Sequence, residues 1–477
     1  MTKRAMECVI PHPVSVTFTS GSFALKDLRA ILVADDVKIL MKDEALDLCR
    51  AFGVKASAVN EDVKEGLLYI RKDPSLAGEA FVLTVEEKSI TLKGGDDAGL
   101  FYGLSALGQI FCAASCSGPL PAKIECGVIE DSPRFAWRSF MLDSARHFQS
   151  KETVKRIIRL LAAYRINVFH WHLTDSQGWR IAMDSVERKA SSDTMSEGFY
   201  TKEEIREIVE YAKSYFIQIV PEVDVPGHSK GFLAAYKQFA CDGMEPGKEF
   251  CLGKPEVMEQ LKKIFAELLE IFPESRYIHF GGDEADTTHW EQCPHCCKAM
   301  KDLGFSNMRQ LENHFMVNLT RFAIEKGRIP IVWGTDTPFP ADTVIQNWSG
   351  NIREPFPHVK NGNPIIISFH TSYYFDYPAN SAEPHETWMF GLPEESIYMA
   401  DPFVIWEDQW KESMLGPEAC LWTETVPQWR VWHKIQPRLA AYAEVAWSLP
   451  QHKDYAIFRE RKELLKAAGY EEYLASL

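Results

Sequence analysis

From residue 133 onward the chain alternates between short apolar runs and longer segments that are apolar on one side only. After Ser150, for example, Val154, Ile157 and Leu161 recur at helical spacing. Alternation of buried strands with amphipathic helices is typical of parallel βα units, and eight such units can close into a barrel. Eight apolar runs are present, at residues 139–142, 167–173, 217–223, 277–280, 329–333, 344–348, 365–369 and 419–422. The pattern predicts an α/β protein with a (β/α)8 TIM barrel.

Residues 1–131 follow a different pattern, in which short strand-like runs at 15–19, 30–34, 67–70, 81–85 and 89–93 are mixed with helical stretches near 37–52 and 98–111. This mixture predicts a small α+β domain in front of the barrel. The acidic, proline-containing segment Glu130-Asp131-Ser132-Pro133 marks its end. We therefore expect an N-terminal α+β domain at residues 1–131 and a barrel domain at 132–477, whose closing helices lie at 438–447 and 455–465.

Composition narrows the classes of partner. The 477 residues include 67 acidic and 52 basic side chains, a formal charge of −15, without a basic block. Nucleic acid and membrane surfaces are therefore not expected as partners, and no apolar run approaches the ~20 residues that span a bilayer. The first residues lack the apolar stretch of a signal peptide, so the chain as written is expected to be cytoplasmic, or periplasmic or secreted if a signal peptide was removed. The oligomeric state stays open.

Eleven cysteines are scattered along the chain, an odd number that argues against a disulfide scaffold. Cys293 and Cys296 form a Cys-x-x-Cys step, and Cys241 and Cys251 lie in an earlier loop that could reach it. Four thiolates fit a structural zinc site, two pairs fit disulfides, and free thiols are the third alternative. The spacing alone does not choose among them.

Polar residues stand at the ends of nearly all the predicted barrel strands, where the active sites of such barrels lie. The most informative stretch follows the fourth strand, where Gly281-Gly282 breaks the strand and Asp283 and Glu284 come next. Adjacent strand residues point to opposite faces. These acids are therefore poorly placed to oppose each other at about 5 Å across one bond, as in an ordinary retaining glycosidase. We expect them to have two different roles.

Aromatic and charged residues gather near the other strand ends. Each tryptophan alone is most simply a core residue. Together these side chains supply what a sugar pocket requires, namely aromatic faces for the apolar side of a pyranose ring and charged groups for its hydroxyls. The residues are Trp333, Trp348, Trp388, Trp422, Arg146, Asp376 and Glu424.

Six motifs carry a family resemblance. The chain resembles the β-N-acetylhexosaminidases of glycoside hydrolase family 20 along the whole barrel, and the segments Ile10-Pro-His-Pro and Gly99-Leu-Phe-Tyr-Gly-Leu resemble the small domain that precedes the barrel in that family. The barrel motifs are Asp131-Ser-Pro-Arg-Phe-Ala-Trp-Arg138, Leu142-Asp-Ser-Ala-Arg146-His, Asn167-Val-Phe-His-Trp-His-Leu-Thr-Asp175, Pro221-Glu-Val-Asp-Val-Pro-Gly-His228, His279-Phe-Gly-Gly-Asp-Glu284 and Leu421-Trp-Thr-Glu424.

The resemblance implies an exo-acting, retaining enzyme that removes terminal β-linked N-acetylglucosamine or N-acetylgalactosamine from oligosaccharides or glycoconjugates. In this family the substrate's own acetamido oxygen attacks the anomeric carbon and forms an oxazolinium intermediate. Glu284 then matches the general acid and base. Asp283 matches the carboxylate that orients the acetamido N–H, and Tyr374 the phenol that binds the acetamido oxygen. No cofactor is implied for catalysis.

The same resemblance assigns the binding residues. The residues that bind the sugar hydroxyls in that family correspond here to Arg146, Asp376 and Glu424. A buried pair behind the acid matches Asp175 and His228. The aromatic walls match Trp333, Trp348 and Trp422, with Trp388 as an outer contact.

Two departures and two rival functions remain. The residues after Trp333 are Gly334-Thr335-Asp336, where the family more often has an acidic pair, and segment 379–395 is hard to align. A metal-dependent amidohydrolase could use His170, His172, His228, His279 and Asp283 as its metal centre, and a catalytically inactive sugar-binding barrel could use the same pocket. The amidohydrolase leaves Glu284 and Tyr374 unexplained, and the inactive barrel is disfavoured because every residue that catalysis needs is present.

Overall fold

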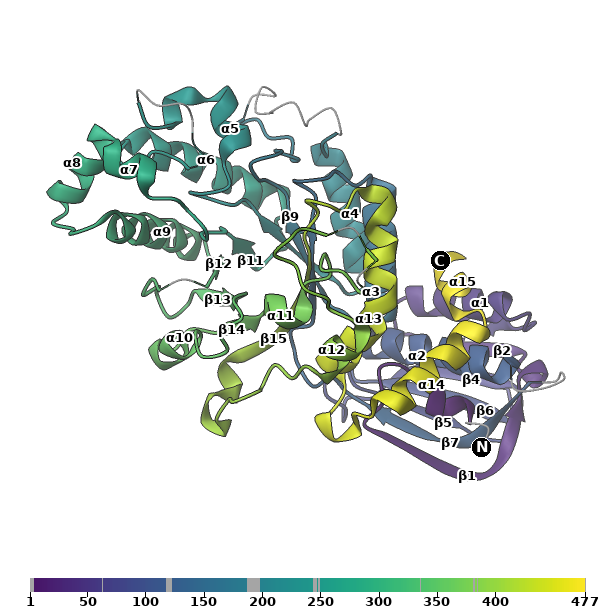
Figure 1. Ribbon diagram of the computed structural model, residues 1–477. Coiled ribbons are helices and arrows are strands. Elements are labelled where there is room, and N and C mark those ends of the chain that lie inside the picture. The colour runs from purple at the N-terminus through teal and green to yellow at the C-terminus, as the bar shows by residue number, and fades with distance from the viewer. Residues whose placement is uncertain are drawn as a thin grey trace.

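The structure is a computed structural model that describes the chain except residues 1–3, 62, 117–121, 187–197, 243–246, 248, 335, 381, 384 and 477. It has two parts, a small mixed sheet with helices and a large barrel (Figure 1). The C-terminus returns to the small domain after the barrel is complete. The closed barrel and the preceding domain confirm the predicted fold class.

The N-terminal domain is one seven-stranded sheet with the order β1-β7-β5-β6-β4-β2-β3. Strands β2, β3, β4 and β6 are parallel to one another, whereas β5 pairs antiparallel with β6 and β7, and β1 with β7. The strands are β1 (Ser15–Ala24), β2 (Ala30–Val33), β3 (Ser57–Val59), β4 (Leu67–Lys72), β5 (Phe81–Val85), β6 (Ser89–Gly94) and β7 (Lys123–Asp131). Strands β3 and β7 are additions to the sequence prediction.

Helices α1 (Leu40–Ala51) and α2 (Asp97–Cys116) belong to this domain, and α2 packs on the sheet. Its stretch Asp97–Ser115 is long and apolar enough to cross a membrane by length and composition, contrary to the expectation that no such run exists. However, 89% of its most apolar window is buried inside the protein. The apolar character of α2 is therefore explained by its place in the core.

The barrel contains the eight predicted strands, all parallel and closed in the order β8-β9-β10-β11-β12-β13-β14-β15. Their carboxyl ends therefore open at one face, which becomes the mouth of the barrel. The bounds are β8 (Ser139–Asp143), β9 (Val168–His172), β10 (Gln218–Glu222), β11 (Tyr277–His279), β12 (Ile329–Trp333), β13 (Val344–Asn347), β14 (Ile365–Ile367) and β15 (Met414–Leu421).

Helices surround the barrel, and their starts follow ordinary capping rules. The Ser150 hydroxyl accepts the N–H of Thr153 at the start of α3, and Thr201 with Glu204 forms a capping box at α4. The helices are α3 (Lys151–Ala163), α4 (Lys202–Ser214), α5 (Lys230–Ala235), α6 (Pro255–Ile271), α7 (Thr288–Gln292), α8 (Pro294–Asp302), α9 (Met308–Glu325), α10 (Phe356–Asn361), α11 (His370–Tyr373), α12 (Glu394–Met399), α13 (Val431–Trp447), α14 (Tyr455–Ala467) and α15 (Tyr470–Ser476).

The last two helices join the two domains. The sequence pattern places a closing helix at 455–465 in the barrel domain, but α14 packs against α2 (Figure 1). The Tyr470 hydroxyl also lies 3.3 Å from the amide nitrogen of Gln109 on α2, and the ring of Tyr473 packs on Phe52. The chain end is thus part of the small domain's core.

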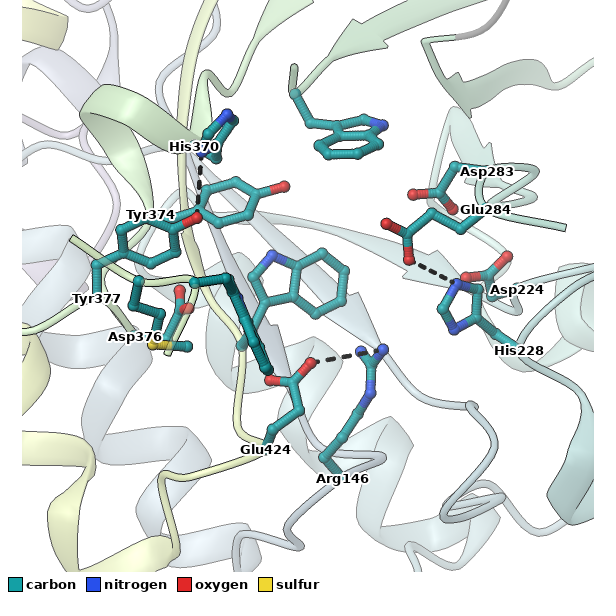
Figure 2. A pocket seen from close by; sticks show the side chains of 14 residues that line it. Arg146, Asp224, His228, Asp283, Glu284, His370, Tyr374, Asp376, Tyr377 and Glu424 are labelled. Carbon is teal, nitrogen blue, oxygen red and sulfur yellow. Dashed lines mark hydrogen bonds and ion pairs between the residues drawn. The ribbon is translucent and has the colours of Figure 1, made fainter. Parts of the chain in front are cut away.

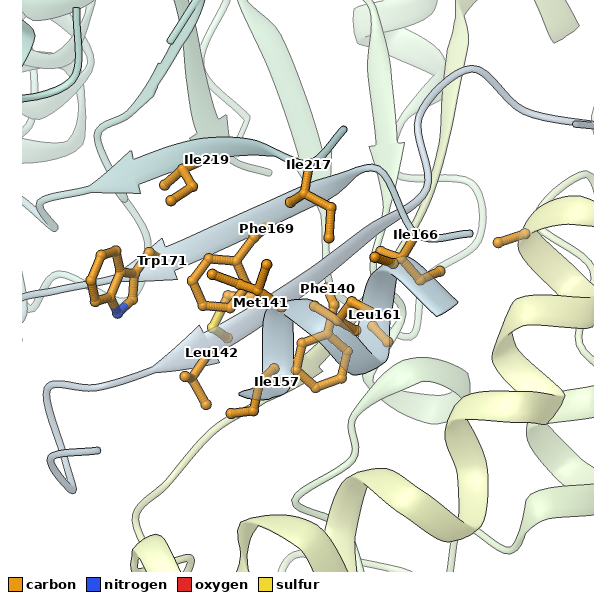
Figure 3. Packing of buried hydrophobic residues seen from close by; sticks show 14 of the residues in the cluster. Phe140, Met141, Leu142, Ile157, Leu161, Ile166, Phe169, Trp171, Ile217 and Ile219 are labelled. Atoms are coloured by element: carbon orange, nitrogen blue, oxygen red, sulfur yellow. The ribbon is translucent and has the colours of Figure 1, made fainter. Parts of the chain in front are cut away.

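The outer face of the barrel wall is apolar, whereas the interior of the barrel has an apolar lower layer and a polar upper layer. Side chains of β8 such as Phe140 and Leu142 pack together with Ile157 and Leu161 of α3 (Figure 3). The lower interior is filled by apolar residues, namely Trp137, Val168, Val220, Ile331, Val344 and Ile366. Above this layer the interior becomes polar, and the buried Glu418 accepts hydrogen bonds from Ser139 (2.5 Å) and Gln346 (2.6 Å). The polar layer supports the mouth, where a ligand can bind.

Candidate active site

A cavity of about 280 Å³ lies at the mouth of the barrel (Figure 2). This is the low end of the range for small-molecule sites and suits a single sugar ring. Loops that follow β8, β10, β11, β13, β14 and β15 supply its lining. The lining residues are Arg146, Asp224, His228, Asp283, Glu284, Trp348, His370, Tyr374, Asp376, Tyr377, Trp388, Met389, Trp422 and Glu424.

The structure brings together all but two of the residues predicted for the site. The exceptions, Asp175 and Trp333, are buried and lie deeper. Four lining residues were not predicted, namely Asp224, His370, Tyr377 and Met389. Only Asp224 gave a signal in the sequence, because it stands at a strand end beside the Pro-Gly-His motif.

The acid pair follows two glycines that have a structural reason. Gly281 and Gly282 have φ values of +69° and +99°, which favour glycine. A Cβ atom on Gly281 would lie 1.7 Å from a carboxylate oxygen of Asp224, and the same oxygen accepts the N–H of Gly282 at 3.1 Å. The loop therefore passes close over Asp224. Glu284 itself has φ +51°, a strained backbone of the kind found at functional sites.

Glu284 stands at the rim of the cavity with its side chain 55% exposed, so a leaving group and water can reach it. Its Oε2 lies 3.6 Å from Nε2 of His228. The other ring nitrogen of His228 is 3.2 Å from Asp175, and Asp175 is 2.8 Å from Arg146. The four residues form a line of alternating charge across the mouth.

Two pKa shifts agree with this line of charges. Burial alone would lower the pKa of His228, but the carboxylates of Asp224 and Asp175 raise it well above its ordinary value. Burial would likewise raise the pKa of Asp175, but Arg146 and His228 hold it below its ordinary value. An imidazolium therefore faces Glu284, with an ionised carboxylate behind it.

Asp283 differs from its neighbour. Its Oδ1 atom is buried and has no hydrogen-bond partner among the described residues. The pKa of Asp283 is raised to about 6, chiefly by burial and also by the nearby carboxylates of Glu284 and Glu222, while His228 opposes the rise. A buried acceptor without a donor is costly. This oxygen is therefore available to a donor that a ligand brings into the cavity.

The far side of the cavity combines one cation with two acids. Arg146 is held by Asp143 (3.4 Å) as well as Asp175, and its guanidinium carbon lies 4.8 Å from the ring centre of Trp422. Glu424 approaches Arg146 at 3.7 Å (Figure 2). Asp376 is buried, its Oδ1 has no partner among the described residues, and burial raises its pKa well above the ordinary value. These groups present a donor and acceptors to hydroxyls.

The aromatic residues line the cavity at different depths. Trp422 is half-buried, and its ring centre lies 6.1 Å from that of Tyr374 and 5.7 Å from that of Trp333. Trp333 is fully buried and donates its indole N–H to Glu222 at 2.8 Å. Trp348 is half-buried, and Trp388 is 62% exposed at the rim. Trp333 thus supports Trp422 from below, whereas Trp388 is an outer contact.

Both segments that depart from the family pattern lie close to the acids. Gly334 and Asp336 line a second cavity on the other side of Asp283 and Glu284, while residue 335 lies outside the described residues. Segment 379–395 brings Trp388 and Met389 to the first cavity, and its residues 381 and 384 are outside the described part. Glu284 therefore stands between two hollows.

The histidines of the rival metal centre have other partners. His172 and His279 lie on Glu222, at 2.5 and 3.2 Å, and His170 lies on Glu418 at 2.8 Å. All three are buried below the cavity. Among the described residues, the groups with metal-ligand spacing that include these histidines do not include Asp283. These three histidines form a hydrogen-bonded floor beneath the cavity rather than the metal centre of the rival amidohydrolase.

Comparison with known proteins agrees with this site. The sequence profile "Glycosyl hydrolase family 20, catalytic domain" matches residues 135–450, and "Glycosyl hydrolase family 20, domain 2" matches residues 7–132. A beta-hexosaminidase of Akkermansia muciniphila is 31% identical over 85% of this chain and 87% of its own length. A beta-N-acetylhexosaminidase of Cellulomonas fimi is 31% identical over 95% and 92%. The chain spans 62% of a beta-hexosaminidase of Porphyromonas gingivalis, also at 31% identity over 95% of this chain.

Solved structures give the same answer. An exo beta-N-acetylglucosaminidase of Vibrio harveyi in complex with N-acetylglucosamine superposes with a TM-score of 0.88 at 26% identity, over 99% of this chain and 79% of that one. A mutant Streptomyces plicatus beta-hexosaminidase in complex with N-acetylglucosamine gives 0.83 at 28% identity, over 98% and 95%. The rival functions are not favoured, and the resemblance read from the sequence is confirmed. The chain belongs to glycosyl hydrolase family 20 and is a glycoside hydrolase with the β-N-acetylhexosaminidase activity of that family.

Proposed function

We propose that the cavity binds a terminal, β-linked N-acetylhexosamine and that Glu284, Asp283 and Tyr374 carry out its substrate-assisted hydrolysis. The observation that carries this assignment is the buried Oδ1 of Asp283, which has no donor among the described residues. The acetamido N–H of the substrate is a donor of the right kind. Tyr374 lines the same cavity and brings a hydroxyl for the acetamido oxygen.

In the first step the acetamido oxygen attacks the anomeric carbon, and the bond from that carbon to the leaving oxygen breaks. The leaving oxygen takes the bonding electrons and receives the proton of Glu284. The resulting oxazolinium ion carries positive charge beside its N–H, and the Asp283 carboxylate stabilises that charge. The two adjacent acids thus act at different atoms of the substrate.

In the second step water attacks the anomeric carbon and the ring oxygen of the oxazolinium leaves, which restores the acetamido group. The Glu284 carboxylate takes the proton from the water. Two displacements at one carbon retain its configuration. The reaction needs no cofactor, because the substrate supplies the nucleophile. A zinc ion at Cys241, Cys251, Cys293 and Cys296 would be structural, since none of the four thiols lines the cavity.

The charged side of the cavity sets the exo mode of action in this proposal. Arg146, Asp376 and Glu424 bind the hydroxyls of the terminal sugar and occupy the space that a further sugar would need. Glu284 is open at the other side, where the aglycone leaves. The Vibrio harveyi relative is described as an exo enzyme and holds N-acetylglucosamine, which supports the same orientation here.

His228 and Asp175 act as positioning residues in this scheme. The imidazolium of His228 lies within 3.6 Å of Glu284 and favours its ionised form during the second step. Asp175 holds the ring in place and is itself fixed by Arg146. One chain of ion pairs therefore links the sugar-binding arginine with the acid.

The test compares two aryl β-glycosides with the same leaving group, one of N-acetylglucosamine and one of glucose. The glucoside lacks the acetamido group, so its hydrolysis is expected to be slower by about 10³-fold or more, given the advantage of an intramolecular nucleophile. Comparable rates for the two substrates would contradict the proposed mechanism. Binding of each sugar, measured by calorimetry, separates a loss of catalysis from a loss of affinity.

A further inference from the structure

Four cysteines meet outside the active site. Cys241, Cys251, Cys293 and Cys296 are all buried, and their sulfur atoms lie within 4.8 Å of one another. Cys251 is 3.6 Å from Cys296 and 3.7 Å from Cys293, and Cys241 is 4.0 Å from Cys296 (sulfur to sulfur). These distances are close to the edge of a zinc–thiolate tetrahedron, which is about 3.8 Å for bonds of about 2.3 Å.

The alternatives fit less well. A disulfide needs a sulfur–sulfur distance of about 2.05 Å and one definite partner for each cysteine. Cys251 stands almost equally far from Cys293 and Cys296, so the cluster shows no pairing. Four free thiols would be four weak donors packed around one point. A tetrahedral set of sulfurs instead favours zinc, or iron in the same geometry.

Local structure prepares the cluster for a metal. Cys293 precedes α8 and Cys296 lies in its first turn, so the Cys-x-x-Cys step places both sulfurs on one side. Gly253, two residues after Cys251, lies against the same helix start, where a Cβ atom would come within 2.1 Å of the backbone of His295. The loop can approach α8 this closely only because residue 253 is glycine.

A buried cation lies beside the cluster. Lys254 is 6% exposed, and its ammonium donates to the backbone oxygen of Ala240 at 2.8 Å, next to Cys241. It also pairs with Asp242 at 2.6 Å, and Asp242 accepts from His295 at 3.0 Å. The contact between Asp242 and His295 therefore links the segment that carries Cys241 to the start of α8, which carries Cys296.

The cluster connects the two loops that carry the acid and its partner. Cys241 and Cys251 belong to the segment between β10 and α6, which also contains His228. Cys293 and Cys296 belong to the segment that follows Glu284. Between them, the indole N–H of Trp290 donates to the oxygen of Phe250 at 2.8 Å. We propose that the four cysteines bind one zinc ion, which fastens these loops and holds Glu284 against His228.

The positional part of this inference rests on the proposed function of Glu284, whereas the binding of zinc does not. The purified full-length protein is therefore analysed first for metal, by mass spectrometry of the elements. One zinc per chain is expected, and protein grown with cobalt should show the visible and thiolate charge-transfer bands of a tetrahedral cobalt–sulfur site. Zinc well below one per chain, or iron in its place, would overturn the proposal.

Cysteine variants locate the metal. C293S and C296S are expected to lose it. The matched control is C297S, because Cys297 is in the same helix but its thiol points to the backbone oxygen of Glu291 (3.2 Å) and not to the cluster. C297S should keep one zinc per chain. Equal metal in C296S and C297S would contradict the site. If both cluster variants fail to fold, the zinc content of the wild type still tests the site, and its denatured chain must give eleven reactive thiols, since disulfides would leave fewer.

Activity separates the two parts of the inference. In chains that remain folded without the metal, kcat is expected to fall about tenfold to a hundredfold because Glu284 is misplaced, while the KM for the terminal sugar changes less. Addition of zinc to C297S should leave its kcat unchanged. Variants without zinc that keep the wild-type kcat would overturn the fastening role, even if the metal content is as expected. Such a result would leave the assignment of Glu284 untouched.

Discussion

Two aspartates in this chain have pKa values that are raised by burial, yet one has a structural role and the other a functional role. Burial raises the pKa of Asp131, at the junction of the two domains, and that of Asp283, at the mouth of the barrel. Asp131 accepts hydrogen bonds from Arg165 (2.5 Å), Trp447 (3.0 Å) and the N–H of Val14 (3.2 Å). The Oδ1 of Asp283 has no partner in the described part of the chain.

The difference teaches that burial by itself does not mark a functional acid. A buried carboxylate whose acceptors are filled is part of the architecture, and here it ties β7 to the helix α13 and to the loop after α3. A buried carboxylate with an unfilled acceptor costs stability until a ligand supplies the donor. Activity should therefore depend on Asp283 and its neighbour, and folding on Asp131.

The largest effect is expected for Glu284→Gln. The amide cannot donate a proton to the leaving oxygen, so kcat should fall by about 10²- to 10⁴-fold on a substrate with a poor leaving group, with the fold and sugar affinity kept. A dinitrophenyl leaving group needs little protonation, so the loss in the first step should be much smaller on that substrate. Equal losses on both substrates would show that Glu284 is not the acid.

Asp283→Asn should cost about 10²- to 10³-fold in kcat, because it removes the charge that stabilises the oxazolinium ion. In contrast to Glu284→Gln, this loss should be similar for good and poor leaving groups, since both form the same intermediate. Steady-state kinetics on the two substrates measures the ratio. A strong dependence of the Asp283→Asn loss on the leaving group would remove the distinction between the two acids.

Asp131→Asn tests the other side of the comparison. Loss of one partner leaves Arg165 buried without its counter-charge, which should lower the free energy of unfolding by about 3–5 kcal/mol, while kcat of the folded protein stays unchanged. The control is Asp408→Asn, because the side chain of Asp408 is 95% exposed and its ion pair with Lys411 should add little to stability. Denaturant titration measures both variants. A reduced kcat in folded Asp131→Asn would contradict the claim that Asp131 has a structural role only.

The smallest effect concerns pH. Asp283 must be ionised to stabilise the positive intermediate, and its pKa is raised to about 6. An acid with a raised pKa becomes protonated below that value, so kcat/KM should be full above about pH 6 and should fall about tenfold per pH unit below it. Asp283→Asn should lack this fall. An acidic limb unchanged in the variant would assign it to another group.

Much of the fold could be predicted because it follows from local patterns. The eight barrel strands are visible in the sequence as apolar runs, and the N-cap residues Ser150 and Thr201 mark the starts of α3 and α4. Strand β7 was missed because Gly127 and the acids at its end interrupt its alternation. The packing of α14 on α2 was missed for another reason: the contact joins segments more than 300 residues apart, and the sequence offers no local sign of it.

Site residues that lie in a sequence motif could be predicted. The depth at which a side chain lies beneath the cavity could not. Asp283, Glu284 and Arg146 lie in motifs at strand ends. Trp333 lies in such a place too, but whether its ring faces the cavity or supports Trp422 from below depends on packing in three dimensions. The same holds for the four cysteines. Their spacing left three alternatives open, and the distances between the sulfur atoms favour one of them.

One measurement tests the central claim most directly. The claim is that the substrate's acetamido group is the nucleophile and that Asp283 binds its N–H. Aryl N-acetylglucosaminides with zero to three fluorine atoms on the acetyl methyl group, and with the same leaving group, are compared by kcat. Fluorine withdraws electrons from the acetamido oxygen, so kcat should fall steeply with each added atom. A kcat that does not change along this series would contradict the account.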